Sequence, residues 1–216
     1  MNNYKYSEYT TNYISGVMSL RKPQRKSLEI LDDLVSDIEL NKSLDKEILK
    51  NKAHHTYPIF TDYDRAFPSF TFALATGVGK TRLMGAFITY LYTRKNIKNF
   101  LVVAPSLTIY NKLINDFANS SSSKYVFNGV GCFEFGPHVI SGDEYRKVNF
   151  GNFSDVKIFV YNAQKFNSND ENRRFNSLNE VLGKSFFDYL SELDDLVVLM
   201  DEAHHYRNNS TSEALD

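Results

Sequence analysis

Two glycines, a lysine and a threonine stand together in the stretch ATGVGKT, residues 75–81. Glycine lets backbone N–H groups approach an anion closely and adopts the backbone angles that a phosphate-binding loop needs. Lys80 would reach the β- and γ-phosphates of a nucleotide, and the hydroxyl of Thr81 would bind Mg²⁺. The stretch therefore predicts a site for ATP and Mg²⁺. Its expected nucleotide contacts are Thr76, Gly77, Val78, Gly79, Lys80 and Thr81.

The strict form of this loop, G-x-x-x-x-G-K-[ST], is incomplete here. Leu74 stands where the pattern requires its first glycine. A glycine turn followed by a surface lysine therefore remains an alternative when the stretch is taken alone.

A pair of carboxylates stands at the end of a second apolar run. In LVVLMDEAHH, residues 196–205, five apolar residues precede Asp201 and Glu202. A nucleotide-hydrolysing site needs one carboxylate for Mg²⁺, which suits Asp201. It also needs a general base that deprotonates the attacking water, which suits Glu202. A solvated acidic strand end is the alternative, but the glycine loop and the acidic pair support each other.

The histidines do not form a recognisable metal pattern. His204 and His205 are adjacent and point in different directions, and the H-E-x-x-H spacing is absent. His54 and His55 have no cysteine cluster near them. A zinc site held by the protein is therefore disfavoured, because structural zinc requires four convergent ligands.

Alternating strands and helices would position these residues. Apolar runs predict buried strands at residues 70–75, 100–105, 156–162 and 196–200. Helical spacing predicts helices from Pro23 to Ile38 and over residues 44–52, 80–91, 107–118 and 178–193. Residues 125–155 suggest only weak strands, and residues 1–20 read as a mobile polar leader. The pattern predicts an α/β fold with a mostly parallel sheet.

Composition limits the class of protein. The 216 residues carry a formal net charge of −1, so any contact with nucleic acid must be local. Cys132 is the single cysteine, which excludes an internal disulfide framework. No apolar run is long enough for a membrane span, and the N-terminus has no apolar signal core. We expect a soluble, cytoplasmic protein without membrane contact.

The quoted motifs resemble those of the superfamily-two helicases and translocases. ATGVGKT is similar to their motif I and DEAH to their motif II, and Leu74 does not depart from that version of motif I. LRKPQ, residues 20–24, resembles their R-x-x-Q element, and VVAPSLTI, residues 102–109, resembles motif Ia. VYNAQKF, residues 160–166, matches a further strand-end element more weakly. The stretch before DEAH is similar to restriction-type helicases, including type III restriction Res subunits.

The resemblance implies a RecA-like P-loop NTPase domain with an N-terminal helical extension. After the polar leader at residues 1–20, it implies N-terminal helices at 21–60 and the ATPase domain at 61–216. It implies adenine contacts for Arg21 and Gln24, and nucleic-acid contacts for Pro105, Ser106 and Gln164. A solvated helix start at Arg21 and Gln24, and a helix cap at Ser106, remain the alternatives.

One part of that superfamily is missing from the sequence. A second RecA-like domain, with a Ser/Thr-Ala-Thr link and an arginine finger, normally follows motif II. The chain ends at Asp216, 15 residues after Asp201, and has neither element. We expect a truncated or split first motor domain that binds ATP–Mg²⁺. It would hydrolyse ATP slowly without a second RecA-like domain or a partner subunit.

Three functions remain open at this point. The first is a motor half that unwinds or translocates on nucleic acid, DNA rather than RNA, in restriction or phage defence. The second is a non-enzymatic module that binds nucleotide or DNA and acts through a partner. The third, a small-molecule kinase, is disfavoured because Asp-Glu-Ala-His suits the activation of water and no substrate lid is visible.

Overall fold

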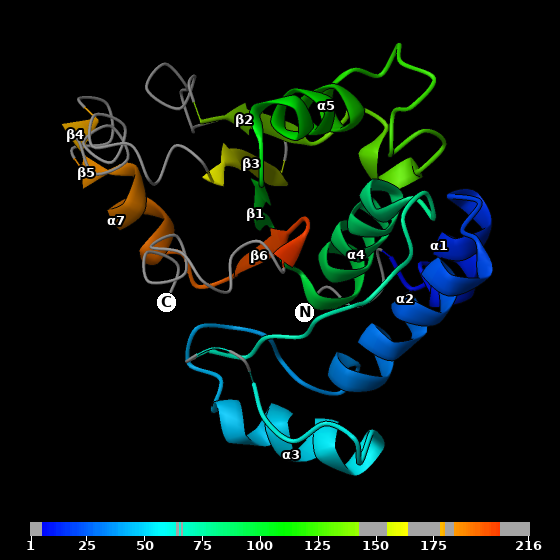
Figure 1. Ribbon diagram of the computed structural model, residues 1–216, viewed down its shortest axis with the longest axis vertical. Helices are drawn as coiled ribbons and strands as arrows, with labels where there is room; N and C mark the ends of the chain where they lie inside the picture. The colour runs from blue at the N-terminus through cyan, green and yellow to red at the C-terminus, as the bar shows by residue number, and fades with distance from the viewer. Residues whose placement is uncertain are drawn as a thin grey trace.

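A four-stranded parallel sheet forms the centre of the computed structural model, which describes residues 6–63, 65, 67–142, 155–163, 178–179 and 184–203. The strands are β1 (Asn99–Ala104), β2 (His138–Ser141), β3 (Lys157–Asn162) and β6 (Leu196–Met200). Their order is β2-β3-β1-β6, and every pair is parallel (Figure 1). The predicted α/β class and three of the four predicted strands are confirmed.

Strand β1 lies between β3 and β6 and is buried along its whole length. Its continuous apolar run follows from burial on both faces of a parallel sheet. The Asp195 carboxylate holds its beginning, because it accepts hydrogen bonds from the Lys98 N–H at 2.6 Å and from the Asn99 side-chain amide at 2.5 Å. This contact ties the start of β1 to the residue that precedes β6.

Helices cover both faces of the sheet. Helices α4 (Lys80–Lys95) and α5 (Leu107–Ala118) share one apolar cluster with Phe100 and Val102 of β1. On the other face, α7 (Phe186–Ser191) packs against Leu101, Val103 and their neighbours (Figure 1). The alternation of side chains along β1 therefore divides the core into two layers.

Three helices precede the glycine loop: α1 (Thr11–Val17), α2 (Lys22–Val35) and α3 (Lys46–Thr56). Helices α1 and α2 lie beside α4, and α3 lies further from the sheet (Figure 1). The expectation of a mobile leader is wrong for residues 9–20. Tyr9, Ile14, Met18 and Leu20 are buried in the main apolar cluster, and α1 packs against α2 and α4.

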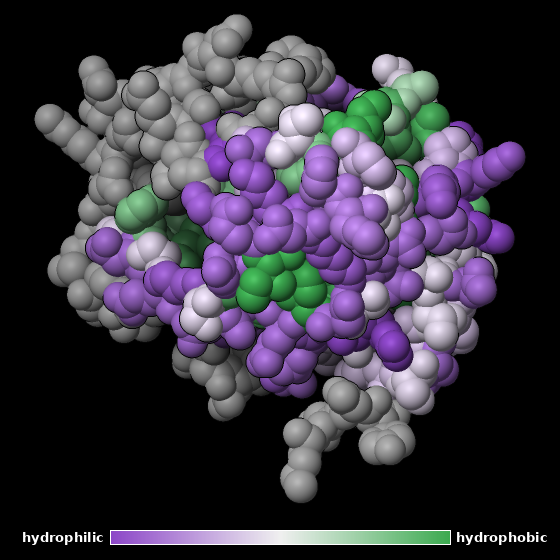
Figure 2. Space-filling model, turned by 90° about the horizontal axis from the view of Figure 1, so that it is seen from below, coloured by the Kyte–Doolittle hydropathy of each residue, from purple (hydrophilic) through white to green (hydrophobic). Residues whose placement is uncertain are grey.

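The surface opposite the sheet is mostly hydrophilic. Figure 2 shows the face seen from below, where an apolar patch near the centre is surrounded by hydrophilic residues and further apolar residues lie near the edges. Two large apolar side chains in and just after α3 are exposed, Ile48 at 54% and Ile59 at 94%. None of the helices in the described ranges is long and apolar enough to span a membrane.

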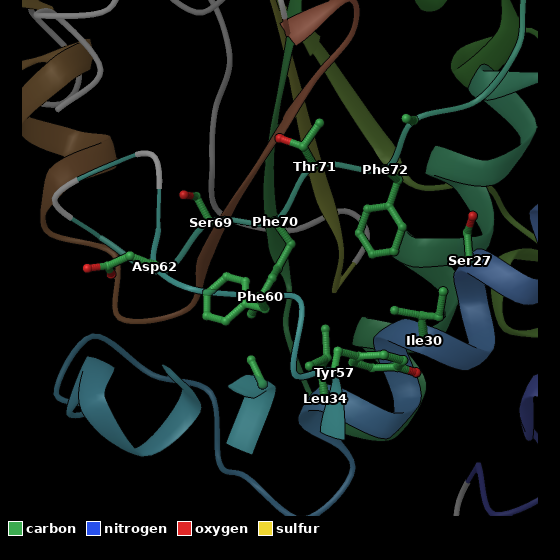
Figure 3. Close-up of a pocket in the computed structure, with 12 residues that line it drawn as sticks. Ser27, Ile30, Leu34, Tyr57, Phe60, Asp62, Ser69, Phe70, Thr71 and Phe72 are labelled. Carbon is green, nitrogen blue, oxygen red and sulfur yellow. The ribbon is translucent and has the colours of Figure 1, made fainter. Parts of the chain in front are cut away.

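The strand predicted at residues 70–75 is wrong, because the structure assigns no strand there. The backbone is extended: Phe70 and Phe72 point to one side and Thr71 to the other (Figure 3). Phe70, Thr71, Phe72 and Ala73 line a cavity of about 400 Å³ between this stretch and helices α2 and α3. A strand requires backbone partners in a ladder, and an apolar run alone does not supply them.

Two other regions differ from the predictions. Of the helix expected over residues 178–193, the described residues contain α7, and the short strands β4 (Leu178–Asn179) and β5 (Lys184–Ser185) precede it; residues 180–183 lie outside the described ranges. The helix starts after Ser185, because the Ser185 hydroxyl accepts a hydrogen bond from the Asp188 N–H at 3.0 Å and caps the N-terminus of α7. Within 125–155, the described part contains β2 and the short 3₁₀ helix Gly131–Phe133. Residues 143–154 lie outside the described ranges.

Candidate functional site

The glycine loop ends at the first turn of α4, as the sequence predicts. Gly77 and Gly79 have φ values of +80° and +98°, which residues with a side chain rarely adopt. The Gly79 carbonyl accepts hydrogen bonds from the N–H groups of Arg82 and Leu83, at 3.1 and 3.2 Å. The loop therefore leads directly into a helix N-terminus, where unpaired N–H groups and the helix dipole favour an anion. Within the loop, Thr76 is exposed and Val78 is half-buried.

Arg21 and Gln24 contact the backbone of this loop. The Arg21 guanidinium donates to the Gly77 carbonyl at 3.0 Å, and the buried Gln24 side-chain amide donates to the Gly79 carbonyl at 2.8 Å. The Gln24 side-chain oxygen also accepts the Arg21 N–H at 2.7 Å, at the start of α2. The R-x-x-Q element thus stands at the start of α2 and also contacts the glycine loop. Its contact with adenine stays a prediction.

The contact with Gln24 leaves no space for a side chain at Gly79. A Cβ atom added at Gly79 would lie 2.8 Å from the Gln24 side-chain nitrogen, whereas one added at Gly77 would meet nothing within 4 Å. The two glycines therefore differ. Gly77 supplies a backbone angle, and Gly79 supplies both an angle and the space for Gln24.

Lys80 and Glu202 form an ion pair. Lys80 Nζ lies 2.5 Å from Glu202 Oε1, and the two side chains are 28% and 30% exposed. Glu202 has a φ of +53°, which is uncommon for a residue other than glycine. The structure thus brings together the residue expected to bind phosphate and the residue expected to activate water.

Asp201 is placed beside them at the carboxyl end of β6. Its N–H donates to the Val103 carbonyl at 3.1 Å, which fixes the residue against β1. Its buried Oδ1 has no hydrogen-bond partner. Burial, and next the Glu202 carboxylate, raise the pKa of the Asp201 carboxyl above its ordinary value, while Lys80 and Lys112 oppose that shift. A buried carboxylate oxygen without a donor suits a cation ligand.

These residues fit Mg²⁺. Thr81, predicted to supply a hydroxyl ligand, is buried in the first turn of α4. The described ranges hold no group of three or more His, Cys, Asp or Glu side chains that could by itself hold a metal ion. Mg²⁺ is usually held by one or two carboxylates together with substrate phosphates, so a hydroxyl and one carboxylate are an appropriate donor set.

Lys112 of α5 belongs to the same group of side chains, and the sequence did not single it out. Its ammonium donates to Thr81 Oγ1 at 3.0 Å and lies 3.7 Å from the Asp116 carboxylate. The i,i+4 spacing of Lys112 and Asp116 is visible in the sequence as a helix-surface pair. Nothing in the spacing indicates that Lys112 reaches Thr81 on another helix.

The residues expected to contact nucleic acid lie at the carboxyl end of β1. Pro105 and Ser106 are half-buried, and the Ser106 hydroxyl accepts the Ile109 N–H at 3.4 Å as the N-cap of α5. The alternative assigned to Ser106 is therefore confirmed, and its contact with nucleic acid stays a prediction. Gln164, His204 and His205 lie outside the described residues.

The cavity in Figure 3 is separate from these side chains. Its lining comes from α2, α3 and residues 57–73, and contains none of the residues predicted to bind nucleotide, metal or nucleic acid. It is largely apolar, with Ile30, Leu34, Phe60, Phe70 and Phe72 in its wall (Figure 3). A phosphate would find no cationic side chain in it, so the glycine loop remains the candidate site.

Comparison with known proteins agrees with this arrangement. The family model described as "Type III restriction enzyme, res subunit" matches residues 17–216. A curated relative is the probable type III restriction-modification enzyme HindVIP Res subunit of Haemophilus influenzae, 31% identical over 141 residues. That match covers 62% of this chain and 24% of the relative, so the chain spans about a quarter of its length. No solved structure matches the chain. The chain belongs to the type III restriction enzyme Res subunit family, and its parallel sheet with flanking helices is the RecA-like motor fold of that family.

Proposed function

We propose that this chain is an ATP–Mg²⁺-binding first motor domain of a DNA helicase or translocase that works in restriction. One observation carries the proposal. The glycine loop, Lys80, Thr81 and the Asp201–Glu202 pair, far apart in the sequence, meet at the N-terminus of α4 and the carboxyl end of β6. Ligands of open α/β sheets bind at the carboxyl ends of the strands.

Each residue has a distinct role in this proposal. The N–H groups of the glycine loop and the first turn of α4 bind the phosphates, and Lys80 neutralises their charge. Thr81 and Asp201 hold Mg²⁺, which neutralises negative charge on the β- and γ-phosphates when it is bound. Glu202 orients the attacking water and takes its proton.

The ion pair between Lys80 and Glu202 suggests an order of events. In the structure Glu202 Oε1 is bound to the Lys80 ammonium at 2.5 Å. A carboxylate that is paired with an ammonium is a weaker base, because the positive charge stabilises its ionised form. Phosphate groups compete for the same ammonium. Binding of ATP would therefore draw Lys80 away and leave the Glu202 carboxylate available to water.

DNA is the nucleic acid we propose. The Haemophilus influenzae relative is described as a restriction-modification enzyme. With a formal net charge of −1, this chain offers DNA no general electrostatic attraction. We therefore place the contact locally, at Pro105 and Ser106 beside the carboxyl end of β1.

Substitution of Lys80 tests the nucleotide site. Lys80→Ala removes the ammonium that faces the phosphates, and we expect affinity for a fluorescent ADP to fall by at least tenfold, since charge-assisted hydrogen bonds contribute about 1.5–3 kcal/mol each. Lys124→Ala is the matched control, because Lys124 is exposed and lies in the loop after α5. Unchanged affinity in Lys80→Ala, measured by fluorescence anisotropy, would contradict the assignment of the loop.

The same measurement addresses one form of the non-enzymatic alternative, a module that binds DNA and not nucleotide. Such a module would bind DNA in a salt-dependent way and bind ADP no better than the Lys80→Ala variant does, whereas a module that binds nucleotide is separated from the motor domain only by its lack of DNA-stimulated hydrolysis. Salt dependence reports phosphate contacts with the nucleic acid.

A further inference from the structure

Lys112 links the proposed metal ligands to a second, buried carboxylate. It lies in α5, and its side chain is 53% exposed, whereas the Asp116 side chain one turn later is 6% exposed. Its ammonium donates to the Thr81 hydroxyl at 3.0 Å. The hydroxyl expected to bind a metal cation is therefore held by a cation that belongs to the protein.

The Asp116 carboxylate is a second binding partner for the Lys112 ammonium. The two charged groups are 3.7 Å apart, an ion pair that is longer than a direct hydrogen bond. The other carboxylate oxygen of Asp116, Oδ1, is buried and has no hydrogen-bond partner. A buried carboxylate with an unused oxygen is costly unless a positive group compensates it. Asp116 therefore favours a closer approach of the ammonium whenever Thr81 releases it.

Two cations cannot share Thr81 at short range. A Mg²⁺ ion binds oxygen at about 2.0–2.1 Å, and an ammonium within hydrogen-bond distance of the same oxygen would repel it strongly. Asp201 is the second proposed ligand, and its buried Oδ1 has no hydrogen-bond partner either. A positive charge is therefore favourable at two positions near Lys112. One lies beside Thr81 and Asp201, and the other lies beside Asp116.

We infer that the Lys112 ammonium competes with Mg²⁺ for the Thr81 hydroxyl. It is bound to that hydroxyl in the structure, and it must move towards Asp116 before Mg²⁺ can bind to Thr81. This inference rests on the proposed function, because it concerns the same Mg²⁺ ligands. Lys112 is a positioning residue that sets how much Mg²⁺ the site requires. It holds the Thr81 hydroxyl in place at low Mg²⁺ and resists a metal ion that arrives without nucleotide.

A magnesium titration tests the inference. A fluorescent ADP is held at fixed concentration, MgCl₂ is added, and the half-saturating Mg²⁺ concentration is compared among wild type, Lys112→Met and Lys124→Met. Methionine is unbranched like lysine and one atom shorter, has a similar helix propensity and carries no charge. We expect Lys112→Met to lower the half-saturating concentration about fivefold, the scale of a partly exposed charge interaction. Lys124→Met, which changes the same charge at an exposed position, should behave as wild type.

Asp116→Asn supplies the second variant. Without the Asp116 charge, Lys112 loses the place to which it retracts, so the half-saturating Mg²⁺ concentration should rise. In the Lys112→Met background the same substitution should have no effect on that concentration. Equal Mg²⁺ dependence of Lys112→Met and Lys124→Met would overturn the inference. A higher Mg²⁺ requirement in Lys112→Met would also overturn it, because Lys112 would then assist the phosphates or the metal.

Thermal unfolding with MgCl₂ alone gives a readout that needs no nucleotide. MgCl₂ should raise the Tm of Lys112→Met more than it raises the Tm of the wild type, because no ammonium competes with the metal in the variant. If no variant binds ADP but this difference in Tm is present, the proposed function fails and the role of Lys112 stands. If ADP binds in every variant and neither readout responds to Lys112, the role of Lys112 fails alone.

Discussion

Lys80 and Glu202 are 122 positions apart in the sequence, and their charged atoms lie 2.5 Å apart in the structure. The residue types and their neighbours in the sequence were sufficient to select both for phosphate and water chemistry. Their pairing with each other was not predicted, because it depends on the placement of α4 against the carboxyl end of β6.

The contacts of Arg21 and Gln24 with distant residues were not predicted from the sequence either. The resemblance of LRKPQ to an adenine-contacting element selected both residues. The structure adds that both donate to carbonyl groups of the glycine loop, 56 positions later for Arg21 and 55 for Gln24. They therefore hold the loop in its shape, whatever each contributes to adenine.

Substitutions in the glycine loop test this support. We expect Gly77→Ala to cost roughly 1–2 kcal/mol, since only its positive φ is strained. Gly79→Ala should cost more, roughly 2–3 kcal/mol, because its Cβ would also lie 2.8 Å from the Gln24 side-chain nitrogen. Urea unfolding measures both costs. The matched pair keeps the chemical change constant, while the contact with Gln24 is present only at Gly79 and φ differs from +80° to +98°.

A double-mutant cycle isolates that contact. If Gln24 causes the additional cost, Gln24→Ala should destabilise the Gly79→Ala protein less than it destabilises the wild type. Equal effects of Gln24→Ala in the two backgrounds would show that the backbone angle of Gly79 accounts for its whole cost.

At the scale of the elements, α4 is the helix on which the arrangement depends. It begins at Lys80, and its residues from Thr81 to Tyr92 are buried except for Arg82. An almost fully buried helix must approach its neighbours closely. Gly85 makes such an approach possible, because a Cβ there would lie 1.9 Å from Val126 Cγ1 and 3.3 Å from Met18 Cε.

Gly85→Ala should therefore destabilise the protein, by about 1–3 kcal/mol, as overpacking of a core does. Gly16→Ala in α1 is the matched control, since a Cβ there meets nothing within 4 Å. It should be neutral or stabilising by up to about 1 kcal/mol, because alanine favours a helix more than glycine does. Thermal or urea unfolding compares the two. A Gly85→Ala protein as stable as wild type would show that α4 and Val126 can separate without cost.

Two elements of the structure differ from those that the sequence predicts. Residues 70–75 have the composition of a strand, and the side chains of residues 70–72 alternate as in one, but residues 70–73 line a cavity and the stretch does not join the sheet. Apolar periodicity reports which side chains avoid water, whereas a strand also requires backbone partners. Likewise, the helix expected at 178–193 begins only after Ser185, because the cap at that residue decides where the helix starts.

At the scale of the whole molecule, the proposed site comes from one RecA-like domain. We expect these 216 residues to bind ATP–Mg²⁺ but turn it over slowly, because an arginine finger from a second domain contributes roughly 10³–10⁵ in rate. Fusing or mixing the chain with a second RecA-like domain of the same family should raise DNA-stimulated phosphate release towards that range. The Glu202→Gln variant is the control, which should retain nucleotide binding and lose the stimulation.

Rapid DNA-stimulated hydrolysis by these residues alone would contradict this expectation, and turnover that survives Glu202→Gln would exclude Glu202 as the general base. The two outcomes are distinct. The first concerns the need for a second domain, and the second concerns the chemistry assigned to one residue.

The sequence by itself determined the α/β class, three strands of the sheet and helices α2, α4 and α5, and it showed the resemblance of ATGVGKT and DEAH to helicase motifs. These features are local: they depend on residue types, short spacings and the period of apolar side chains. Only the tertiary structure decided that Gln24 holds Gly79, that Lys80 pairs with Glu202 and that Lys112 reaches Thr81. Those contacts join different elements, so their partners follow from how helices pack on the sheet and not from the order of residues along the chain.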